Sequence, residues 1–121
     1  MAARAGTTGD YAGKLEEMAW HDGNSGGQTH PVGEKKPNPW SLYDMHGNVW
    51  EWVQDWFGQD YYGSRPNPDK DPGGPDTGSF RVFRGGGCNS PAQNCRSAYR
   101  SSYGPGSRSY ALGFRLLRQA R

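Results

Sequence analysis

Residues 38–56 read NPWSLYDMHGNVWEWVQDW, and this stretch decides the fold. It holds four of the five tryptophans of the 121-residue chain, with Asp44 and Glu51 on either side of a Gly47-Asn48 turn. Large aromatic rings contribute most to stability when they are buried. Because only 32% of the residues are hydrophobic, we expect these tryptophans to build the core.

Within this stretch, residues 48–57 alternate between two kinds of position. Trp50, Trp52 and Trp56 share one parity, whereas Glu51 belongs to the other. A period of two residues is typical of a strand whose two faces differ in surroundings. The pattern predicts a strand over 48–57 with its tryptophan side turned toward a core.

The remaining elements are predicted to be short and separated by long loops. The chain contains 19 glycines and 9 prolines, but 13% of its residues are aromatic, which argues against disorder. We predict one helical turn over 14–20, with Leu15, Met18 and Ala19 on one side, strands over 80–84, 94–101 and 111–118, and loops over 21–39, 58–79 and 102–110. A single domain of this size has a thin stability margin, so a bound metal or partner subunit would help it.

Charge is divided unevenly along the chain. The net charge is +2, but residues 80–121 contain eight arginines and no acidic residue, so all 12 acidic residues lie in residues 1–79. One interpretation is that the two halves fold onto each other and pair their charges. The other is a basic face for an anionic partner such as nucleic acid, since arginine suits bidentate pairing and stacking.

The sequence favours a cytoplasmic location and leaves the state of its two cysteines open. The first residues lack the apolar stretch of a secretory leader, and no apolar run is long enough to span a membrane, so we expect a cytoplasmic protein. Cys88 and Cys95 are separated by six residues, which is not a zinc-site spacing. A disulfide, a copper(I) site and two free thiols remain open, and the cytoplasm favours free thiols.

The two carboxylates of the tryptophan-rich stretch suggest a calcium site. Calcium prefers carboxylate and carbonyl oxygens, which Asp44 and Glu51 would supply from side chains and Gly47 and Val49 from the backbone. The alternative is that Asp44 caps the turn and Glu51 pairs with an arginine of the basic half. The three histidines show no metal-ligand spacing, so we expect them to make ordinary hydrogen bonds.

Residues 87–111 have the composition of a binding surface. They are rich in tyrosine, serine, glycine and asparagine, which combine rigid contact area with adaptable hydrogen bonding. An ordinary polar loop is the alternative. The candidate ligand-binding residues are Ser90, Tyr99, Arg100, Tyr103, Arg108 and Tyr110.

Several motifs together resemble the formylglycine-generating enzyme family, also called the sulfatase-modifying-factor domain. They are ARAGT at 3–7, THPVG at 29–33, NPWSLYDMHGNVWEW at 38–52, RVFRGG at 81–86, RSAYR at 96–100 and GFR at 113–115. The resemblance implies an irregular α+β, C-type-lectin-like fold with short antiparallel strands, long loops and little helix. It also implies calcium at Asp44, Gly47, Val49 and Glu51. The whole chain, residues 1–121, is interpreted as one such domain without the N-terminal part usual in the family, and a homodimer would complete its sheet.

The chain departs from the oxidases of this family at their copper site. Those enzymes hold copper(I) on two cysteines in a Cys-x4-Cys motif after Gly-Gly-Ser. Counting forward from Gly85-Gly86 places the first cysteine on Ser90 and the second on Cys95. Serine does not replace a soft thiolate for copper(I), so only Cys95 is left as a catalytic candidate.

Other relatives of the family do not carry the oxidase pair. They include sulfoxide synthases of the ergothioneine type and variable proteins of diversity-generating retroelements, whose C-terminal segments display ligand-contacting residues. We therefore expect a ligand-binding module that presents residues 87–111 to a protein or peptide and lacks complete oxidase chemistry. A copper-dependent oxidase that converts a substrate cysteine to formylglycine is the first alternative. Binding of an anion or nucleic acid by the arginine-rich half is the second.

Overall fold

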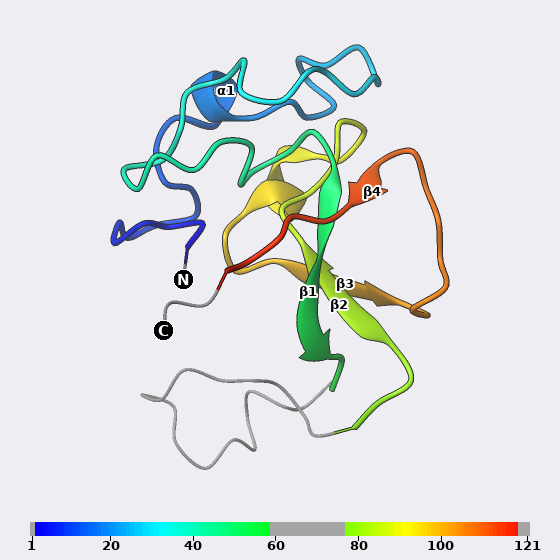
Figure 1. Cartoon of the computed structure of the whole chain (residues 1–121). Coiled ribbons are helices and arrows are strands. Elements are labelled where there is room, and N and C mark those ends of the chain that lie inside the picture. The colour runs from blue at the N-terminus through cyan, green and yellow to red at the C-terminus, as the bar shows by residue number, and fades with distance from the viewer. Residues whose placement is uncertain (1, 59–76, 119–121) are drawn as a thin grey trace.

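The computed structural model describes residues 2–58 and 77–118 of the chain. Its elements are α1 (Leu15–Met18), β1 (Trp50–Trp56), β2 (Arg81–Arg84), the 3-10 turn η1 (Ala92–Cys95), β3 (Arg100–Tyr103) and β4 (Leu112–Gly113). The strands form one sheet in the order β3-β2-β1-β4 (Figure 1). Pairing is antiparallel between β1 and β2 and between β2 and β3, and parallel between β1 and β4. This is the expected α+β fold with short strands and little helix, although the parallel β1–β4 pair makes the sheet mixed where only antiparallel strands were expected.

The helix α1 is a single turn that anchors the N-terminal segment. Leu15 and Met18 are buried, and Ala19 directly after them is fully inaccessible. The turn ends where Ala19 adopts an extended conformation with φ of −136°. The predicted helical turn over 14–20 is therefore confirmed in a shorter form, with the predicted inner side.

The strand β1 confirms the alternation of the tryptophan-rich stretch. Trp52 lies opposite Phe83, and Trp56 lies opposite Arg81 across an irregularity in the ladder. The rings of Trp50 and Trp52 meet Phe83 edge-on, with centroids 4.9 and 5.6 Å apart. The tryptophans of β1 therefore lie together on one face of the sheet, as the alternation predicted.

The expectation that the tryptophans build the core is wrong. Trp50, Trp52 and Trp56 are only partly buried, and Trp40 is 57% exposed. The buried apolar residues are Ala5, Leu15, Met18, Ala19, Val82, Phe83, Cys88, Cys95 and Ala111. A core of mostly small side chains at one end of the sheet leaves the aromatic face half open.

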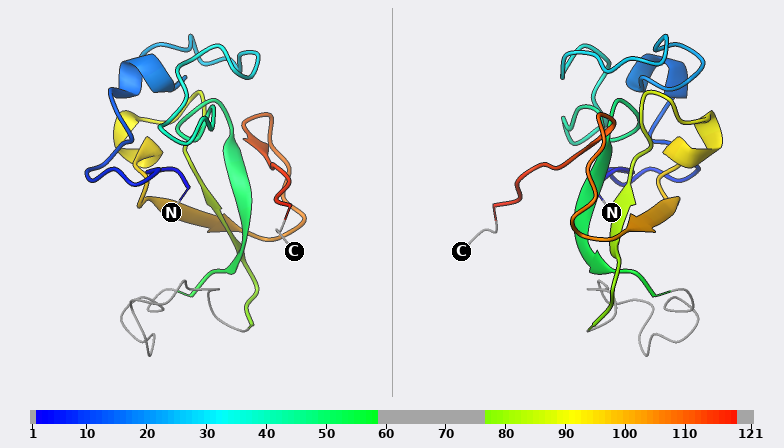
Figure 2. Two further views of the ribbon diagram at one scale, coloured as in Figure 1. Left: turned by 60° about the vertical axis from the view of Figure 1, so that its left-hand side comes forward. Right: turned by 90° about the vertical axis from the view of Figure 1, so that its right-hand side faces the viewer.

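Two of the predicted strands have different bounds in the structure. Residues 94–101 divide into η1 and β3, because Pro91 fixes the extended residue that precedes a 3-10 turn (φ −65°). Residues 111–118 pair only over β4, and the segment after it runs away from the sheet (Figure 2). The predicted strand over 80–84 is confirmed by β2. Of the predicted loop over 58–79, residues 59–76 lie outside the described part of the chain.

Left-handed backbone conformations shape the turn that precedes β1. Asp44, Gly47 and Asn48 have φ values of 55°, 80° and 66°. A side chain at Gly47 would collide with the backbone of Trp20, so this position requires glycine for both conformation and space. Asn48 then fixes the preceding loop, because its amide accepts from His30 N (2.9 Å) and donates to His30 O (2.9 Å). No helix in the described residues is long and apolar enough to cross a membrane.

Candidate functional site

A pocket of about 370 Å³ opens on the aromatic face of the sheet. All four strands and the loop around η1 contribute to it. The lining residues are Trp50, Phe83, Asn89, Ser90, Pro91, Asn94, Tyr99, Ser101, Tyr103, Ser109, Ala111 and Leu112. We call this the aromatic pocket. Three of the six predicted ligand-binding residues, Ser90, Tyr99 and Tyr103, lie in it.

The walls of the aromatic pocket are mutually packed rings. Phe83 lies at its centre, edge-on to Trp50 and stacked on Tyr103 with centroids 5.1 Å apart. Tyr99 lies 5.9 Å from Trp50. Rings that pack on one another present a preformed, rigid apolar surface. This geometry follows from the alternation, since Trp50, Phe83, Ser101 and Tyr103 come from the same face of neighbouring strands.

The polar groups of the aromatic pocket fall into two sets. The hydroxyls of Ser90 and Ser109 are occupied, because they accept hydrogen bonds from Gly87 N (2.9 Å) and Ala111 N (3.2 Å). In the described part of the chain, no hydrogen bond holds the side-chain amides of Asn89 and Asn94 or the hydroxyl of Ser101. The unoccupied set is available to a ligand.

The remaining predicted ligand-binding residues lie outside this pocket. The Arg100 guanidinium stacks over Phe57 (4.8 Å to the ring centroid) and donates to Gly58 O (3.3 Å). Arg108 and Tyr110 are exposed, and the Tyr110 hydroxyl is 3.5 Å from Gly27 O. No acidic or basic side chain is among the residues that line the aromatic pocket.

Cys95 lies in the core and not on an open surface. It packs with Leu15 and Ala19 and has no accessible area. Burial raises the pKa of its thiol to about 12, so it is protonated at neutral pH. Cys88 is equally buried, and both cysteines are free thiols.

His46 is a buried structural residue that holds the chain around Cys95. Its Nδ1 lies 2.7 Å from Cys95 O, and its Nε2 lies 3.3 Å from Ala12 N. The second contact requires Nε2 to accept, so Nδ1 carries the proton and the ring is neutral. Burial lowers the pKa of His46. The sequence predicted hydrogen-bonding histidines but did not show that His21 and His46 are the buried ones.

The predicted calcium ligands gather around a second cavity of about 480 Å³. Asp44, Val49 and Glu51 line it, whereas Gly47 is not among the lining residues. Asp44 Oδ2 accepts from Gly33 N at 2.9 Å, but its buried Oδ1 has no hydrogen-bond partner. A buried carboxylate oxygen without a partner is costly, and a bound cation would satisfy it.

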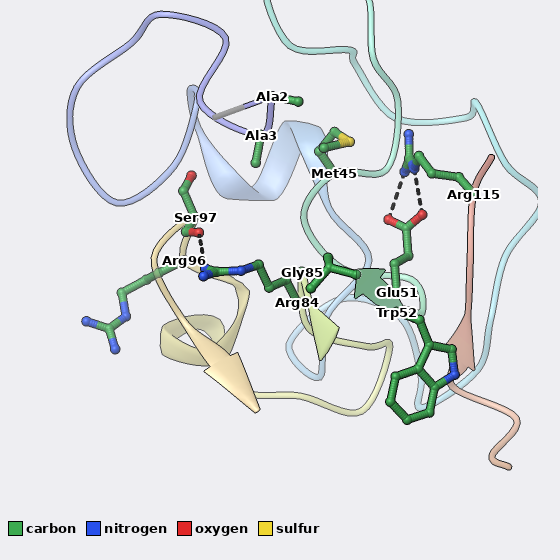
Figure 3. Close-up of a pocket in the computed structure, with 11 residues that line it drawn as sticks. Ala2, Ala3, Met45, Glu51, Trp52, Arg84, Gly85, Arg96, Ser97 and Arg115 are labelled. Atoms are coloured by element: carbon green, nitrogen blue, oxygen red, sulfur yellow. Dashed lines mark hydrogen bonds and ion pairs between the residues drawn. The ribbon is translucent and has the colours of Figure 1, made fainter. Parts of the chain in front are cut away.

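Glu51 is engaged by Arg115 of the second half of the chain. Arg115 donates from Nε at 2.5 Å and from one terminal nitrogen at 2.9 Å to the two carboxylate oxygens (Figure 3). The same nitrogen reaches Tyr43 O and Asp44 O at 2.9 and 3.1 Å. The hydrogen bond to Glu51 raises the pKa of Arg115. This pair is the alternative that the sequence offered for Glu51, and it places a positive charge between the two carboxylate residues.

Arg81, Arg84 and Arg96 of this half also have local partners. Arg81 stacks on Trp56 at 3.6 Å and donates to Gln54 O. Arg96 donates to Gln93 O at 2.7 Å, and Arg84 lies 3.4 Å from Ser97 O, at the edge of a 200 Å³ apolar pocket (Figure 3). Within residues 2–58 and 77–118, no three His, Cys, Asp or Glu side chains form a cluster for a metal ion. A calcium site here would therefore depend on backbone carbonyls as well as on two carboxylates.

Known proteins resemble this chain in sequence over most of its length. Residues 1–120 match the family described as "Sulfatase-modifying factor enzyme 1-like domain". The formylglycine-generating enzyme of Streptomyces coelicolor is 46% identical over 95 residues, which is 76% of this chain and 30% of that protein. Serine/threonine-protein kinase pkn1 of Chlamydia pneumoniae is 46% identical over 79 residues, which is 65% of this chain and 13% of that protein.

Solved structures share the fold. Treponema denticola variable protein 1 matches with a TM-score of 0.83 and 41% identity, over 93% of this chain and 42% of that one. PvdO from Pseudomonas aeruginosa matches with a TM-score of 0.79 and 32% identity, over 93% of this chain and 46% of that one. This chain spans less than half the length of each of these four proteins. With a family match over residues 1–120, it belongs to the sulfatase-modifying-factor, or formylglycine-generating enzyme, family.

Proposed function

We propose that this chain is a ligand-binding module of its family, without complete oxidase chemistry, and that it binds a protein or peptide in the aromatic pocket. One observation carries the proposal: Ser90, Tyr99 and Tyr103 meet in a preformed pocket with unoccupied polar groups. The 41% identity with a protein named as a variable protein supports it, because the sequence resembles variable proteins in the same C-terminal segment.

The pocket works through shape and hydrogen bonding. The rings of Trp50, Tyr99 and Tyr103, which remain partly exposed around the buried Phe83, offer area that a ligand would cover. Asn89, Asn94 and Ser101 supply donors and acceptors that fix the ligand's orientation. Arg115 and Glu51 support the sheet from outside the pocket, where they tie the segment after β4 to β1.

Selection of displayed peptides would test the proposal. A random-peptide phage library is selected against the chain, and binding clones are measured again on the Tyr99→Ala and Tyr103→Ala variants. We expect at least one of these variants to lose about tenfold in affinity, as a truncated contact residue does. Trp40→Ala, which removes an exposed ring outside the pocket, serves as the matched control. Clones that bind both pocket variants normally would contradict the proposal.

A calcium ion is proposed as a structural cofactor. The residues that would hold it are Asp44 and Glu51 through carboxylates and Val49 through its carbonyl, with Gly47 as the fourth residue implied by the family. The unpartnered Asp44 Oδ1 supports this assignment. When bound, calcium would neutralise the two carboxylates and hold the turn against β1, a role that the Arg115 guanidinium also serves for Glu51.

Oxidation of a substrate cysteine is the second candidate function. The 46% identity with the formylglycine-generating enzyme of Streptomyces coelicolor favours it. Against it stand the serine at position 90 and the core position of Cys95, whose protonated thiol is a poor copper(I) ligand. Titration with copper(I) and a cysteine-containing sulfatase peptide distinguishes the oxidase from the ligand-binding module. Stoichiometric copper binding with loss of the peptide thiol would favour the oxidase and contradict the first proposal.

A further inference from the structure

We infer that Arg115 competes with calcium for Glu51, and that it withdraws when the ion binds and thereby frees residues 114–118, the segment after β4. The inference rests on the calcium site proposed above and adds its regulation by a residue of the chain itself. Three observations lead to it: the oxygen atoms around the Arg115 guanidinium, the unequal burial of Arg115 and Glu51, and the contacts of the segment after β4.

The Arg115 guanidinium is surrounded by oxygen atoms beside the cavity of the proposed calcium site. It donates to the two carboxylate oxygens of Glu51 at 2.5 and 2.9 Å (Figure 3). It also donates to Tyr43 O and Asp44 O at 2.9 and 3.1 Å. Carboxylate and backbone carbonyl oxygens are the ligands that calcium takes as well. The guanidinium therefore uses the same class of ligands as the ion, and one of the same carboxylates.

Glu51 cannot serve both cations fully at the same time. Each of its carboxylate oxygens already accepts a hydrogen bond from Arg115. A calcium ion in contact with either oxygen would share that oxygen with the guanidinium. The doubly and singly charged cations would then repel each other in a partly buried site, where water and salt screen the repulsion little. Full coordination by Glu51 thus requires Arg115 to withdraw.

The burial of the two side chains determines which of them moves. The Glu51 side chain is 16% exposed, whereas that of Arg115 is 40% exposed. A largely buried carboxylate without a positive partner is strongly unfavourable, so Glu51 keeps the guanidinium until an ion replaces it. The more exposed guanidinium regains water when it leaves. This difference allows the two cations to exchange at a carboxylate that stays in place.

Arg115 also attaches the segment after β4 to the rest of the molecule. In the part of the chain that the structure describes, residues 114–118 belong to no strand, and their side-chain hydrogen bonds all come from Arg115. Leu116 and Leu117 are 89% and 93% exposed, so packing adds little to this attachment. Withdrawal of Arg115 therefore frees the segment from β1 and from the turn that precedes it.

Calorimetric titration with calcium chloride would test the competition. Arg115→Gln removes the competing charge, so it should bind calcium at least about tenfold more tightly than the parent chain. Arg115→Lys keeps the charge and should stay closer to the parent. Arg118→Gln removes the same charge from an exposed residue of the same segment and serves as the matched control, with an affinity within about threefold of the parent. Circular dichroism verifies that each variant is folded.

NMR spectra of the parent chain would test the movement directly. In EDTA, the Nε–H resonance of Arg115 should report a hydrogen-bonded group, and added calcium should shift it to the position of a solvated guanidinium. The heteronuclear NOE of Leu116 and Leu117 should fall on addition of calcium. It should already be low in Arg115→Gln without the ion. Trp52, which is held in β1 by its pairing with Phe83, should keep its NOE throughout.

The outcomes distinguish the inference from the calcium site beneath it. If Arg115→Gln binds calcium no more tightly than the parent, or if calcium leaves the Arg115 Nε–H resonance of the parent unchanged, the competition is wrong although the calcium site stands. If neither chain binds calcium, both the site and the inference are wrong. Should Arg115→Gln be unfolded, the resonances of the parent chain decide alone.

Discussion

Asn48 illustrates how much of this fold rests on single polar residues. It has a left-handed backbone, is buried, and makes two hydrogen bonds to His30. Asn38 acts in the same way, because its amide donates to Ala2 O and accepts from Trp40 N. In a loop-rich chain, these amides replace the regular backbone ladders that helices and strands would provide.

Replacement of Asn48 by alanine should be severe. It removes both hydrogen bonds to His30 and places a β-carbon at φ 66°, so we expect a loss of about 2–4 kcal/mol in the free energy of unfolding. Urea denaturation measures the loss. Asn89→Ala, at an exposed residue whose side-chain amide has no hydrogen bond within the described residues, should change stability by no more than about 0.5 kcal/mol. Equal effects of the two substitutions would contradict the structural role of Asn48.

Gly86 and Cys95 form a second testable contact at this scale. A β-carbon at Gly86 would lie 2.5 Å from Cys95 Sγ, and the glycine has φ of 74°. Gly86→Ala should therefore cost at least about 2 kcal/mol. Cys95→Ala in the same chain should recover only part of this loss, because the Cys95 α-carbon (3.1 Å) and Asn94 O (3.2 Å) remain close. A double-mutant cycle by urea denaturation measures the coupling, and strictly additive losses would contradict the contact.

His46 makes stability depend on pH in a defined direction. Its pKa is lowered in the folded state by burial, so protonation favours the unfolded chain, where the pKa is about 6.5. The contribution of His46 is constant above about pH 7, and stability falls as the pH drops below about 6.5. Denaturation of the parent chain and of His46→Asn at several pH values between about 7 and about 5.5 measures how steeply the stability of each depends on pH. A variant with the same slope as the parent would contradict the assignment.

At the scale of elements, the turn over 41–48 and β1 carry the proposed calcium site. If calcium binds there, its removal by EDTA should lower the melting temperature by roughly 5–15 °C, the shift expected for loss of a ligand bound well above its dissociation constant. Asp44→Asn should abolish the difference between calcium and EDTA. Asp55→Asn, which changes a carboxylate of β1 outside the cavity, should preserve it. An unchanged melting temperature of the parent in EDTA would exclude a stabilising site.

The elements also show what sequence patterns do and do not contain. The period of two residues predicted β1 and its tryptophan face, and the family motifs predicted the fold class, because both are local properties of the chain. The same pattern did not reveal that this face is half open, since alternation says that two faces differ but not what covers each. The division of 94–101 into η1 and β3 was missed because Pro91 acts from outside the alternating segment.

The candidate pocket was predictable only in part, because composition is a local property of the chain and the pairing of strands is not. Composition singled out Ser90, Tyr99 and Tyr103, which line the pocket, whereas Trp50 was expected in the core and Phe83 was predicted only as part of a strand. Arg100 was selected as a ligand contact, but its guanidinium stacks on Phe57. Only the register of β2 and β3 shows which residues of the segment share a face.

At the scale of the whole molecule, two features leave apolar surface and sheet edges accessible. Both β3 and β4 are edge strands, and Phe114, Leu116 and Leu117 after β4 are 71%, 89% and 93% exposed. Exposed apolar side chains beside a free edge favour association. This supports the expectation of a homodimer, which would pair the segment after β4 and leave β3 for the ligand.

Sedimentation velocity across a wide range of protein concentrations would test this arrangement. We expect the chain to shift from monomer to dimer as its concentration rises, and Leu116→Glu with Leu117→Glu to keep it monomeric by placing two charges on the shared surface. Trp40→Glu, a matched change at an exposed ring of the first half, should dimerise like the parent. Peptide binding by the monomeric variant should be unchanged, since the aromatic pocket opens beside β3. A dimer that persists in the double variant, or that blocks peptide binding, would place the interface at β3 and contradict this division of the two edges.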